Sequence, residues 1–270
     1  RKDGSTGGIE RIDRALGVAR ACGEPHALAV VLRERATADW ETGGYPQALV
    51  RFEEAAAAAR ACGSELELAR CINSRGACNL WMDRFPEAIL AFEEALVIFR
   101  RIGERVGEVS TSGNLGIVLK ETGRVDEAIR RYEEVEREAA EIGAAALLAT
   151  VLSNHAIALS DRGRVADAVR LFARVEELHR QQGDKGGLAR NLGNRGVLLM
   201  RENRHREALR ILEQAHTLFQ EMQDRRAAAM NLRNMGDCHR MTGDREGALA
   251  RYRESGEEDD PPVDPRTPHR

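Results

Sequence analysis

The sequence predicts an all-α protein, a right-handed α-solenoid of antiparallel helix pairs. Its composition is 42% hydrophobic and 31% charged but only 4% aromatic. This favours helices over a β-sandwich, which is rich in β-branched and aromatic residues. The sequence also repeats with a period of 40 residues. Periods of about 20 to 50 residues are typical of solenoids and other repeat arrays.

Four columns of this repeat keep one kind of residue in almost every unit. One column of turn-forming residues is Gly43, Asp83, Gly123, Gly163, Asn203 and Gly243. A second is Gly23, Gly63, Gly103, Gly143, Gly183 and Gln223. The alanine column is Ala48, Ala88, Ala128, Ala168, Ala208 and Ala248. The large apolar column, four places later, is Phe52, Phe92, Tyr132, Phe172, Leu212 and Tyr252.

These columns divide each unit into two helices, which we call the A helix and the B helix. Gly, Asn and Asp tolerate the left-handed conformation that ends a helix. After Gly123, apolar residues follow at the spacing of an amphipathic helix. A column of small residues lies near the middle of the A helix: Ala36, Gly76, Gly116, Ala156, Gly196 and Gly236. Glycine costs about 1 kcal/mol against alanine inside a helix, so its recurrence predicts close packing against the backbone.

The elements follow in a fixed order along the chain. We expect a flexible leader at 1–8, a single B-type helix at 9–22, and a disordered acidic, proline-rich tail at 257–270. The A helices are expected at 25–41, 65–82, 105–121, 145–161, 185–201 and 225–241. The B helices are expected at 46–62, 86–102, 125–142, 165–181, 205–222 and 245–256. The repeats therefore span about 25–62, 65–102, 105–142, 145–182, 185–222 and 225–256. Because helix pairs bury their apolar stripes against neighbouring pairs, residues 9–256 are expected to form one solenoid domain.

Local signals support several of the helix starts. Ser64 followed by Glu67 has the spacing of a capping box. Asp184 and Asp224 stand at the heads of their helices. Pro46 and Pro86 fall in the first turn of a B helix, where a missing N–H costs nothing.

The order of these columns resembles the tetratricopeptide repeat (TPR), whose usual unit has about 34 residues. A small residue is followed by alanine twelve places later and by an aromatic residue four places beyond that. The longer units, with phrases such as GDKGGLARNLGNRG (183–196), resemble the repeats of kinesin light chains and Pins-type adaptors. They also resemble the repeat arrays of actinobacterial NTPase regulators. The resemblance covers residues 9–256 and implies a TPR superhelix that binds another polypeptide.

The resemblance further implies that the A helices line a concave groove in which a peptide binds. The groove-facing polar column is then Ser74, Asn114, Asn154, Asn194 and Asn234, with Glu34 departing from it. Asparagine is a mediocre helix former, so its recurrence needs a reason. Its amides are suited to bind a peptide backbone, or they hold adjacent helices together by hydrogen bonds. The two interpretations are compatible, and the sequence leaves both open.

Arginines flank this column, and two tryptophans lie near its edge. In related grooves guanidinium groups bind carboxylates, and the candidates here are Arg33, Arg70, Arg190 and Arg233, with Asn73 nearby. The alternative is a solvated charged face or an inter-helix salt bridge. A basic groove in a chain of net charge −3 predicts an acidic partner. Trp40 and Trp81 are expected as anchors for a partner side chain or as core residues against the following B helix.

Charge and motifs exclude several other functions. With 44 acidic and 41 basic residues, no overall field draws the chain to nucleic acid or to a membrane. No apolar run is long enough for a membrane span. No HExxH, histidine pair at helical spacing or phosphate loop occurs, so we expect no catalytic residue, no metal and no cofactor. The odd cysteine count without CxxC predicts reduced, buried thiols of a cytoplasmic protein: Cys22, Cys62, Cys71, Cys78 and Cys238.

The sequence therefore predicts a non-enzymatic scaffold that binds a protein or peptide, as the sensor or adaptor arm of a larger signalling protein. One alternative is a regulator resembling peptide-pheromone receptors. Another is an accessory domain of a protease or NTPase whose catalytic part lies outside this sequence. Exposed solenoid ends also predict self-association. The chain begins with Arg1 instead of Met, and we expect it to be a piece of a longer, bacterial protein.

Overall fold

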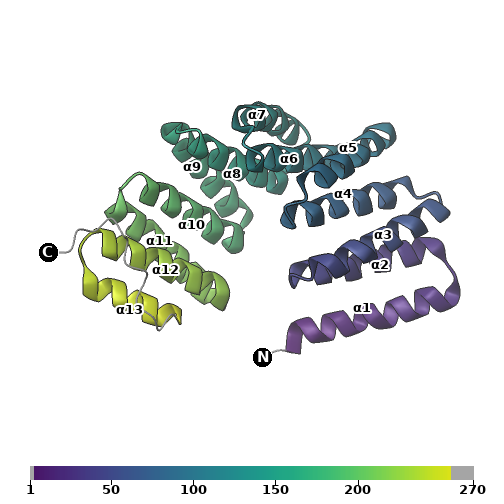
Figure 1. Cartoon of the computed structure of the whole chain (residues 1–270), viewed down its shortest axis with the longest axis horizontal. Coiled ribbons are helices and arrows are strands. Elements are labelled where there is room, and N and C mark those ends of the chain that lie inside the picture. Colours follow the sequence, from purple (N-terminus) through teal and green to yellow (C-terminus); the bar gives the residue numbers. More distant parts are fainter. Residues whose placement is uncertain (1–2, 257–270) are drawn as a thin grey trace. The chain divides into compact units, whose positions relative to one another are not determined.

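The computed structural model describes residues 3–256, and every regular element in that range is an α-helix (Figure 1). The chain opens with α1 (Asp3–Cys22). The A helices are α2 (Pro25–Glu41), α4 (Glu65–Trp81), α6 (Arg105–Glu121), α8 (Ala145–Asp161), α10 (Lys185–Arg201) and α12 (Arg225–Met241). The B helices are α3 (Tyr45–Ala61), α5 (Phe85–Ile102), α7 (Val125–Glu141), α9 (Val165–Gln182), α11 (His205–Glu221) and α13 (Arg245–Ser255). The predicted fold class, an α-solenoid of antiparallel helix pairs, is confirmed.

The six helix pairs begin and end within one residue of their predicted bounds. The leader prediction is wrong for residues 3–8, which belong to α1. We expected these residues to be flexible because Gly4, Gly7 and Gly8 are poor helix formers. Intrinsic propensity is a weak prior, however, and the helix that follows extends through them. The tail predicted at 257–270 lies outside the described residues.

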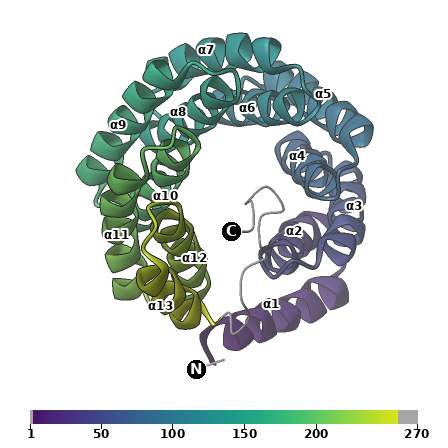
Figure 2. The same ribbon diagram turned by 60° about the vertical axis from the view of Figure 1, so that its left-hand side comes forward.

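The described chain divides into two compact units, and each is considered by itself. Unit 1 is Arg1–Ala158 and unit 2 is Leu159–Arg270, so the division falls inside α8. In unit 1, α2 contacts α4 and α4 contacts α6, and in unit 2 α10 contacts α12. Figure 2 shows these successive A helices side by side within their units. That residues 9–256 form a single domain stays a prediction.

The turn residues adopt the conformation that their columns predict. The glycines of both columns have φ between +66° and +83°. The non-glycine members, Asp83, Asn203 and Gln223, also have positive φ, at 56°, 58° and 58°. These three are the only non-glycine residues with positive φ in the described part of the chain. The left-handed residue is therefore needed at each turn even where the sequence does not supply glycine.

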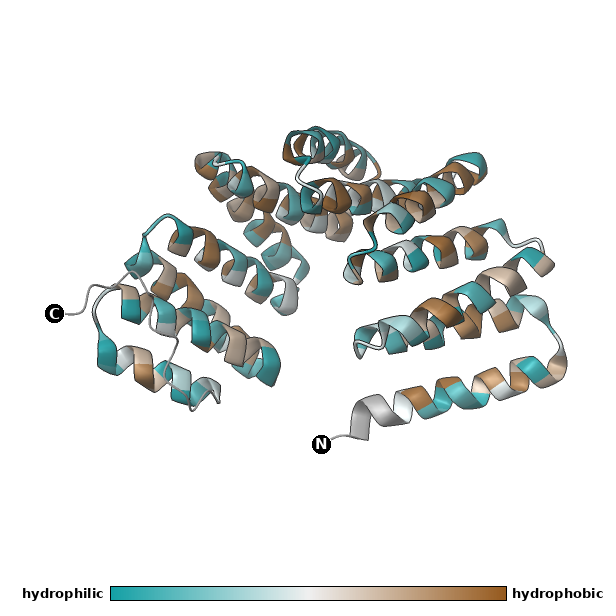
Figure 3. Ribbon diagram, viewed as in Figure 1, coloured by the Kyte–Doolittle hydropathy of each residue, from teal (hydrophilic) through white to brown (hydrophobic). Residues whose placement is uncertain are grey.

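The alanine, large apolar and small columns form the core between the helices of each pair. Every member of the alanine and large apolar columns is buried. A Cβ placed on Gly76 would lie 2.6 Å from the ring of Phe92, and one on Gly116 would lie 2.6 Å from the ring of Tyr132. The predicted close approach to the A-helix backbone is thus made by a side chain of the B helix of the same pair. Figure 3 shows apolar and polar residues alternating around the helices, as amphipathic packing requires.

The helix starts agree with the sequence at two of the three predicted caps. The carboxylates of Asp184 and Asp224 accept hydrogen bonds from the amides of Gly187 (2.8 Å) and Ala227 (3.0 Å). The capping box predicted at Ser64 is wrong, because the Ser64 side chain makes no cap hydrogen bond. Its expected partner, Glu67, has a different role that is described below. Among residues 3–256, no helix has both the length and the apolar character needed to cross a bilayer.

Candidate functional site

The asparagine column (Ser74, Asn114, Asn154, Asn194 and Asn234) lies in the middle of successive A helices and reaches the surface. In unit 1, Ser74, Asn114 and Asn154 are partly exposed. In unit 2, Asn194 is exposed and Asn234 is partly exposed. The column members therefore have the exposure that contact with a partner requires.

The hydrogen bonds of the column differ from one member to the next. Asn114 Nδ2 donates to Asn73 Oδ1 at 3.3 Å, which joins α6 to α4. For this pair the inter-helix interpretation holds. Within the described residues, Asn154, Asn194 and Asn234 make no side-chain hydrogen bond to the protein. Their amides remain the strongest candidates for contact with a partner.

Two other asparagines, which the sequence did not single out, are structural. Asn191 Nδ2 donates to the carbonyl oxygen of Phe172 at 2.9 Å, and Asn231 Nδ2 donates to that of Leu212 at 2.7 Å. Both asparagines are buried. Each ties an A helix of unit 2 to the B helix before it. The signal was present in the sequence, because both occupy one column three places before Asn194 and Asn234.

Arg33 and Arg70 meet at an internal carboxylate. Arg33 Nε lies 2.8 Å from Glu67 Oε2, and Arg70 Nη1 lies 2.8 Å from Glu67 Oε1. Arg33 also pairs with Glu34 at 2.9 Å. Glu67 is only 5% exposed, and its bond to Arg33 crosses from α4 to α2. The structure therefore shows the inter-helix salt bridge that was the alternative reading of Arg33.

The electrostatics of Glu67 follow from these two arginines. Burial by itself would raise the pKa of the Glu67 carboxyl, but the hydrogen bonds and charges of Arg33 and Arg70 outweigh it and lower the pKa. Burial would likewise lower the pKa of Arg33, but the contact with Glu67 raises it. Glu67 and Arg33 are thus held in their charged forms.

The two arginines predicted in unit 2 are exposed. Arg190 lies on α10, near Asp184 at the start of that helix, and helps to lower the pKa of the Asp184 carboxyl. The main cause of that shift is the hydrogen bond from the Gly187 amide. Arg233 is exposed on α12, beside Asn234. In this unit the positive charge lies next to the asparagine column at the surface.

The two tryptophans meet at the end of the first A helices, where Tyr45 joins them. The rings of Trp40 and Trp81 are 6.4 Å apart with an interplanar angle of 73°. Tyr45 stacks on Trp81 at 6.2 Å and 11°. Trp40 packs against the buried cluster that includes Ala36 and Phe52, so its core interpretation is confirmed. Trp81 is 60% exposed and keeps a free aromatic surface.

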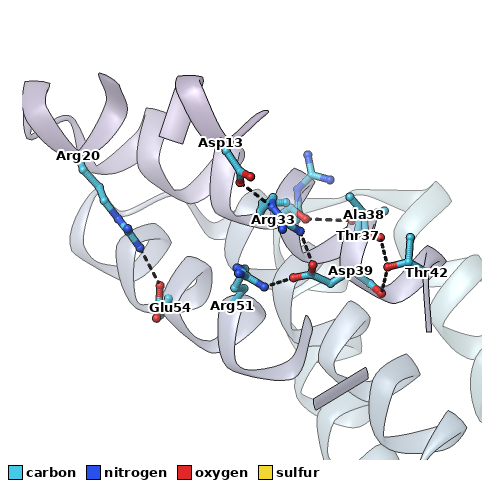
Figure 4. A network of polar contacts seen from close by, with 10 residues as sticks. Asp13, Arg20, Arg33, Thr37, Ala38, Asp39, Thr42, Arg51 and Glu54 are labelled. Carbon is cyan, nitrogen blue, oxygen red and sulfur yellow. Dashed lines mark hydrogen bonds and ion pairs between the residues drawn. The ribbon is translucent and has the colours of Figure 1, made fainter. Parts of the chain in front are cut away.

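A second polar cluster joins α1 to the first helix pair (Figure 4). Arg35 Nε donates to Asp13 Oδ1 at 2.7 Å. Asp39 accepts from both Arg35 and Arg51, so one carboxylate links α2 with α3. Arg20 and Glu54 form a looser pair at 3.5 Å. The charged groups of this cluster are paired with one another. The Arg35–Asp13 and Arg20–Glu54 pairs hold α1 against the first helix pair.

Comparison with known proteins supplies the family. The sequence matches the tetratricopeptide repeat over residues 68–137, 147–221 and 189–255, which is more than half of the chain. The chain belongs to the tetratricopeptide repeat family. A search of curated proteins finds no match.

Several solved structures share this TPR fold at low sequence identity. BtubC (BKLC) from P. vanneervenii is 18% identical, with a TM-score of 0.62, over 99% of this chain and 97% of that one. A Rap protein complexed with competence and sporulation factor is 14% identical, with a TM-score of 0.74, over 92% of this chain and 68% of that one. A STAND ATPase with a tetratricopeptide repeat sensor from Pyrococcus horikoshii is 13% identical, with a TM-score of 0.68, over 84% of this chain and 35% of that one. At these identities the likeness shows the fold alone.

The remaining reactive groups of this TPR chain are largely buried. Burial, together with the Glu67 carboxylate, raises the pKa of Cys71 to about 12. Burial also raises the pKa of Cys78 to about 12 and that of Cys238 to about 11. The burial prediction is wrong for Cys22, which is exposed as the last residue of α1, and Cys62 is only partly buried. Across residues 3–256, no group of three or more His, Cys, Asp or Glu side chains is placed to hold a metal ion.

Proposed function

We propose that the A-helix surface of this TPR chain binds an extended segment of a partner protein, and that the chain is a non-enzymatic scaffold. The observation that carries the proposal is the pair of amides at Asn194 and Asn234 in unit 2, with an amide of the same kind at Asn154 in unit 1. They lie at the surface in the middle of A helices without a protein hydrogen bond. Each offers both a donor and an acceptor, which is what an extended peptide backbone needs. TPR-type repeats are generally non-catalytic scaffolds, in agreement with this role.

The predicted site residues take two different roles in this proposal. Asn194 and Asn234 contact the peptide backbone on unit 2, and Asn154 has the same role on unit 1. Arg33, Arg70, Asn73 and Asn114 shape the surface, because their charges and amides are engaged with neighbouring helices. The preference for acidic segments is assigned to the exposed guanidinium group of Arg190 in unit 2, with Arg233 exposed on the next A helix.

We place the chain as the sensor or adaptor arm of a larger cytoplasmic regulatory protein, and its likeness to a STAND protein with a TPR sensor supports that placement. A regulator that binds a free signalling peptide is the second candidate. It is favoured by the likeness to a Rap protein complexed with competence and sporulation factor. The two differ in the ligand, which is a segment of a folded protein in the first case and a short free peptide in the second.

The test is peptide display on the full chain, followed by affinity measurements with the selected peptides. Asn154→Ala and Asn194→Ala are each expected to weaken binding about tenfold, as for loss of one good hydrogen bond. Thermal stability should hold or rise, since alanine is the better helix former. Glu134→Ala, on the exposed side of α7, is the matched control and should change neither quantity.

The opposite pattern would contradict the proposal. If both asparagine variants bind normally but melt at lower temperature, the column is structural. Charge reversal at Arg190 and Arg233 tests the acidic preference, which fails if binding responds neither to the reversal nor to salt. Sedimentation of the chain over a range of concentrations tests the expected self-association.

A further inference from the structure

A small cavity opens in unit 1 between the first two A helices. It measures about 170 Å³, and its lining comes from α2, α3 and α4: Thr37, Trp40, Phe52, Asn73, Ser74 and Ala77. Two of these residues, Asn73 and Ser74, belong to the predicted peptide-binding surface. The cavity therefore lies on the A-helix side of the unit, beside the asparagine column.

The sequence of the first two repeats explains why space is left at this place along the column. Ser74 stands where the next four repeats have asparagine, and its hydroxyl is smaller than the carboxamide of asparagine. Thr37 and Ala77 stand where the next three repeats have larger residues, Ile117, Ile157 and Val197. Smaller side chains in both columns leave space that the later repeats fill. The cavity thus depends on residues at positions that vary between repeats.

Several polar groups of the cavity lining are already engaged or covered within the chain. The indole Nε1 of Trp40 is buried and has no hydrogen-bond partner among the described residues. The Asn73 side-chain oxygen already accepts from Asn114, which leaves its amino group. The Thr37 hydroxyl donates to the Arg33 carbonyl. The Trp40 N–H has almost no accessible surface, so it does not open into the cavity. Among the described residues, this leaves the Asn73 amino group and the Ser74 hydroxyl as the polar groups of the lining without a hydrogen bond inside the chain.

The remaining walls of the cavity are apolar. Phe52 is buried, Trp40 and Ala77 are partly buried, and the exposed ring of Trp81 lies against Trp40. Aromatic walls around a pocket of this size favour an apolar group over several waters, which would need more polar partners than the cavity offers. Its walls therefore match an apolar side chain.

We propose that this cavity takes one apolar side chain, of leucine or phenylalanine size, from an extended peptide segment of the partner. This rests on the proposed peptide binding by the A-helix surface, and it adds the class of residue read at one position. Ser74 is the positioning residue of the cavity, because its small size keeps the space open.

The chain has only two tryptophans, so nuclear magnetic resonance of ¹⁵N-labelled indole groups tests the proposal directly. The full chain gives two indole signals, and Trp81→Phe assigns the signal of Trp40. The probes are N-acetyl-leucinamide, N-acetyl-phenylalaninamide and, as the control without a side chain, N-acetyl-glycinamide. The first two are expected to move the Trp40 indole signal saturably, with millimolar affinity for ligands of this size. The glycine compound should have at least tenfold less effect.

Ser74→Asn restores the residue of the neighbouring repeats and fills the cavity, so it should abolish the saturable shift while the fold is kept. Ser153→Asn introduces the same change on α8, away from the cavity, and should respond as the unmodified chain does. The proposal is overturned if neither apolar probe moves the Trp40 signal. It is also overturned if the shift is unchanged in Ser74→Asn.

The selected peptides separate this proposal from the proposed function. If they bind with dependence on Asn154 and Asn194 but Ser74→Asn leaves their affinity unchanged, the cavity proposal fails and the peptide-binding function stands. If the apolar probes move the Trp40 signal but no peptide binds the chain, the peptide-binding function fails. The proposal that the cavity takes a side chain of a partner peptide then fails as well.

Discussion

Replacing Arg33 with methionine removes one of the two cations that hold the buried Glu67 carboxylate. Methionine keeps the apolar stem of the side chain but not the guanidinium. Removal of one partner from a fully buried ion pair costs about 3 to 5 kcal/mol. Here Arg70 keeps its bond to Glu67, and the Arg33 side chain is 20% exposed. We therefore expect a loss of about 2 to 3 kcal/mol, below the fully buried case.

Tryptophan fluorescence during urea unfolding measures this loss of stability in the helices that carry the ion pair. The only two tryptophans, Trp40 and Trp81, lie on α2 and α4, the helices that the Arg33–Glu67 bond joins. With a urea dependence of about 2 kcal/mol per molar, the midpoint should fall by roughly 1 M. Arg101→Met is the matched control, because its pair with Glu65 is exposed on both sides. An exposed pair contributes about 0 to 1 kcal/mol.

The pH dependence of the free energy of unfolding is a second, independent test of this ion pair. Because the pKa of Glu67 is lowered in the folded chain, its contribution is fully present above the ordinary glutamate pKa of about 4.3. The contribution is lost as the pH falls through the lowered folded-state pKa. The difference between Arg33→Met and the unmodified chain should therefore shrink in acid. A loss no larger than that of Arg101→Met, and equal at every pH, would refute the structural role of Arg33.

Three further predictions follow from packing, capping and burial. Gly116→Ala should destabilise the fold by about 1 to 2 kcal/mol, because the added Cβ would meet the buried ring of Tyr132. Gly113→Ala is the control on the same helix, where an added Cβ would find no atom closer than 3.8 Å. It should stabilise the fold by about 0.5 to 1 kcal/mol, and urea unfolding measures both changes. Asp184→Ala should cost about 1 kcal/mol through its lost cap. Since the pKa of Asp184 is lowered, that cost should fade as the pH drops through its folded-state value, and a pH-independent cost would argue against the cap. In native alkylation followed by mass spectrometry, Cys22 should react while three thiols stay protected until urea is added: Cys71, Cys78 and Cys238.

The sequence determined the repeat, the helix bounds and the family. A 40-residue period places each helix end by local chemistry, because turn residues such as Gly123 and Asn203 act within their own turn. The alanine and large apolar columns likewise predicted the core, since residues at a fixed offset within one helix pair meet in every repeat. These features depend on short-range spacing, which a single sequence records directly.

The sequence could not determine how polar side chains choose their partners. Glu67 has the spacing of a capping box with Ser64, but the structure pairs it with Arg33, 34 residues earlier. Asn114 has the same column position as Asn154, yet only Asn114 is given a partner by Asn73. Such choices depend on which side chains of adjacent helices face each other, and on whether burial makes an ion pair worth forming.

The A-helix surface was thus predictable in outline, and its details were decided by tertiary structure. The columns predicted which residues lie on the A-helix surface. The packing of α2 against α4 decided that Arg33 and Arg70 hold an internal carboxylate and that a cavity opens beside Trp40. The physical reason is that the repeat fixes the backbone, whereas cavities and ion pairs arise where neighbouring repeats differ in side-chain size and charge.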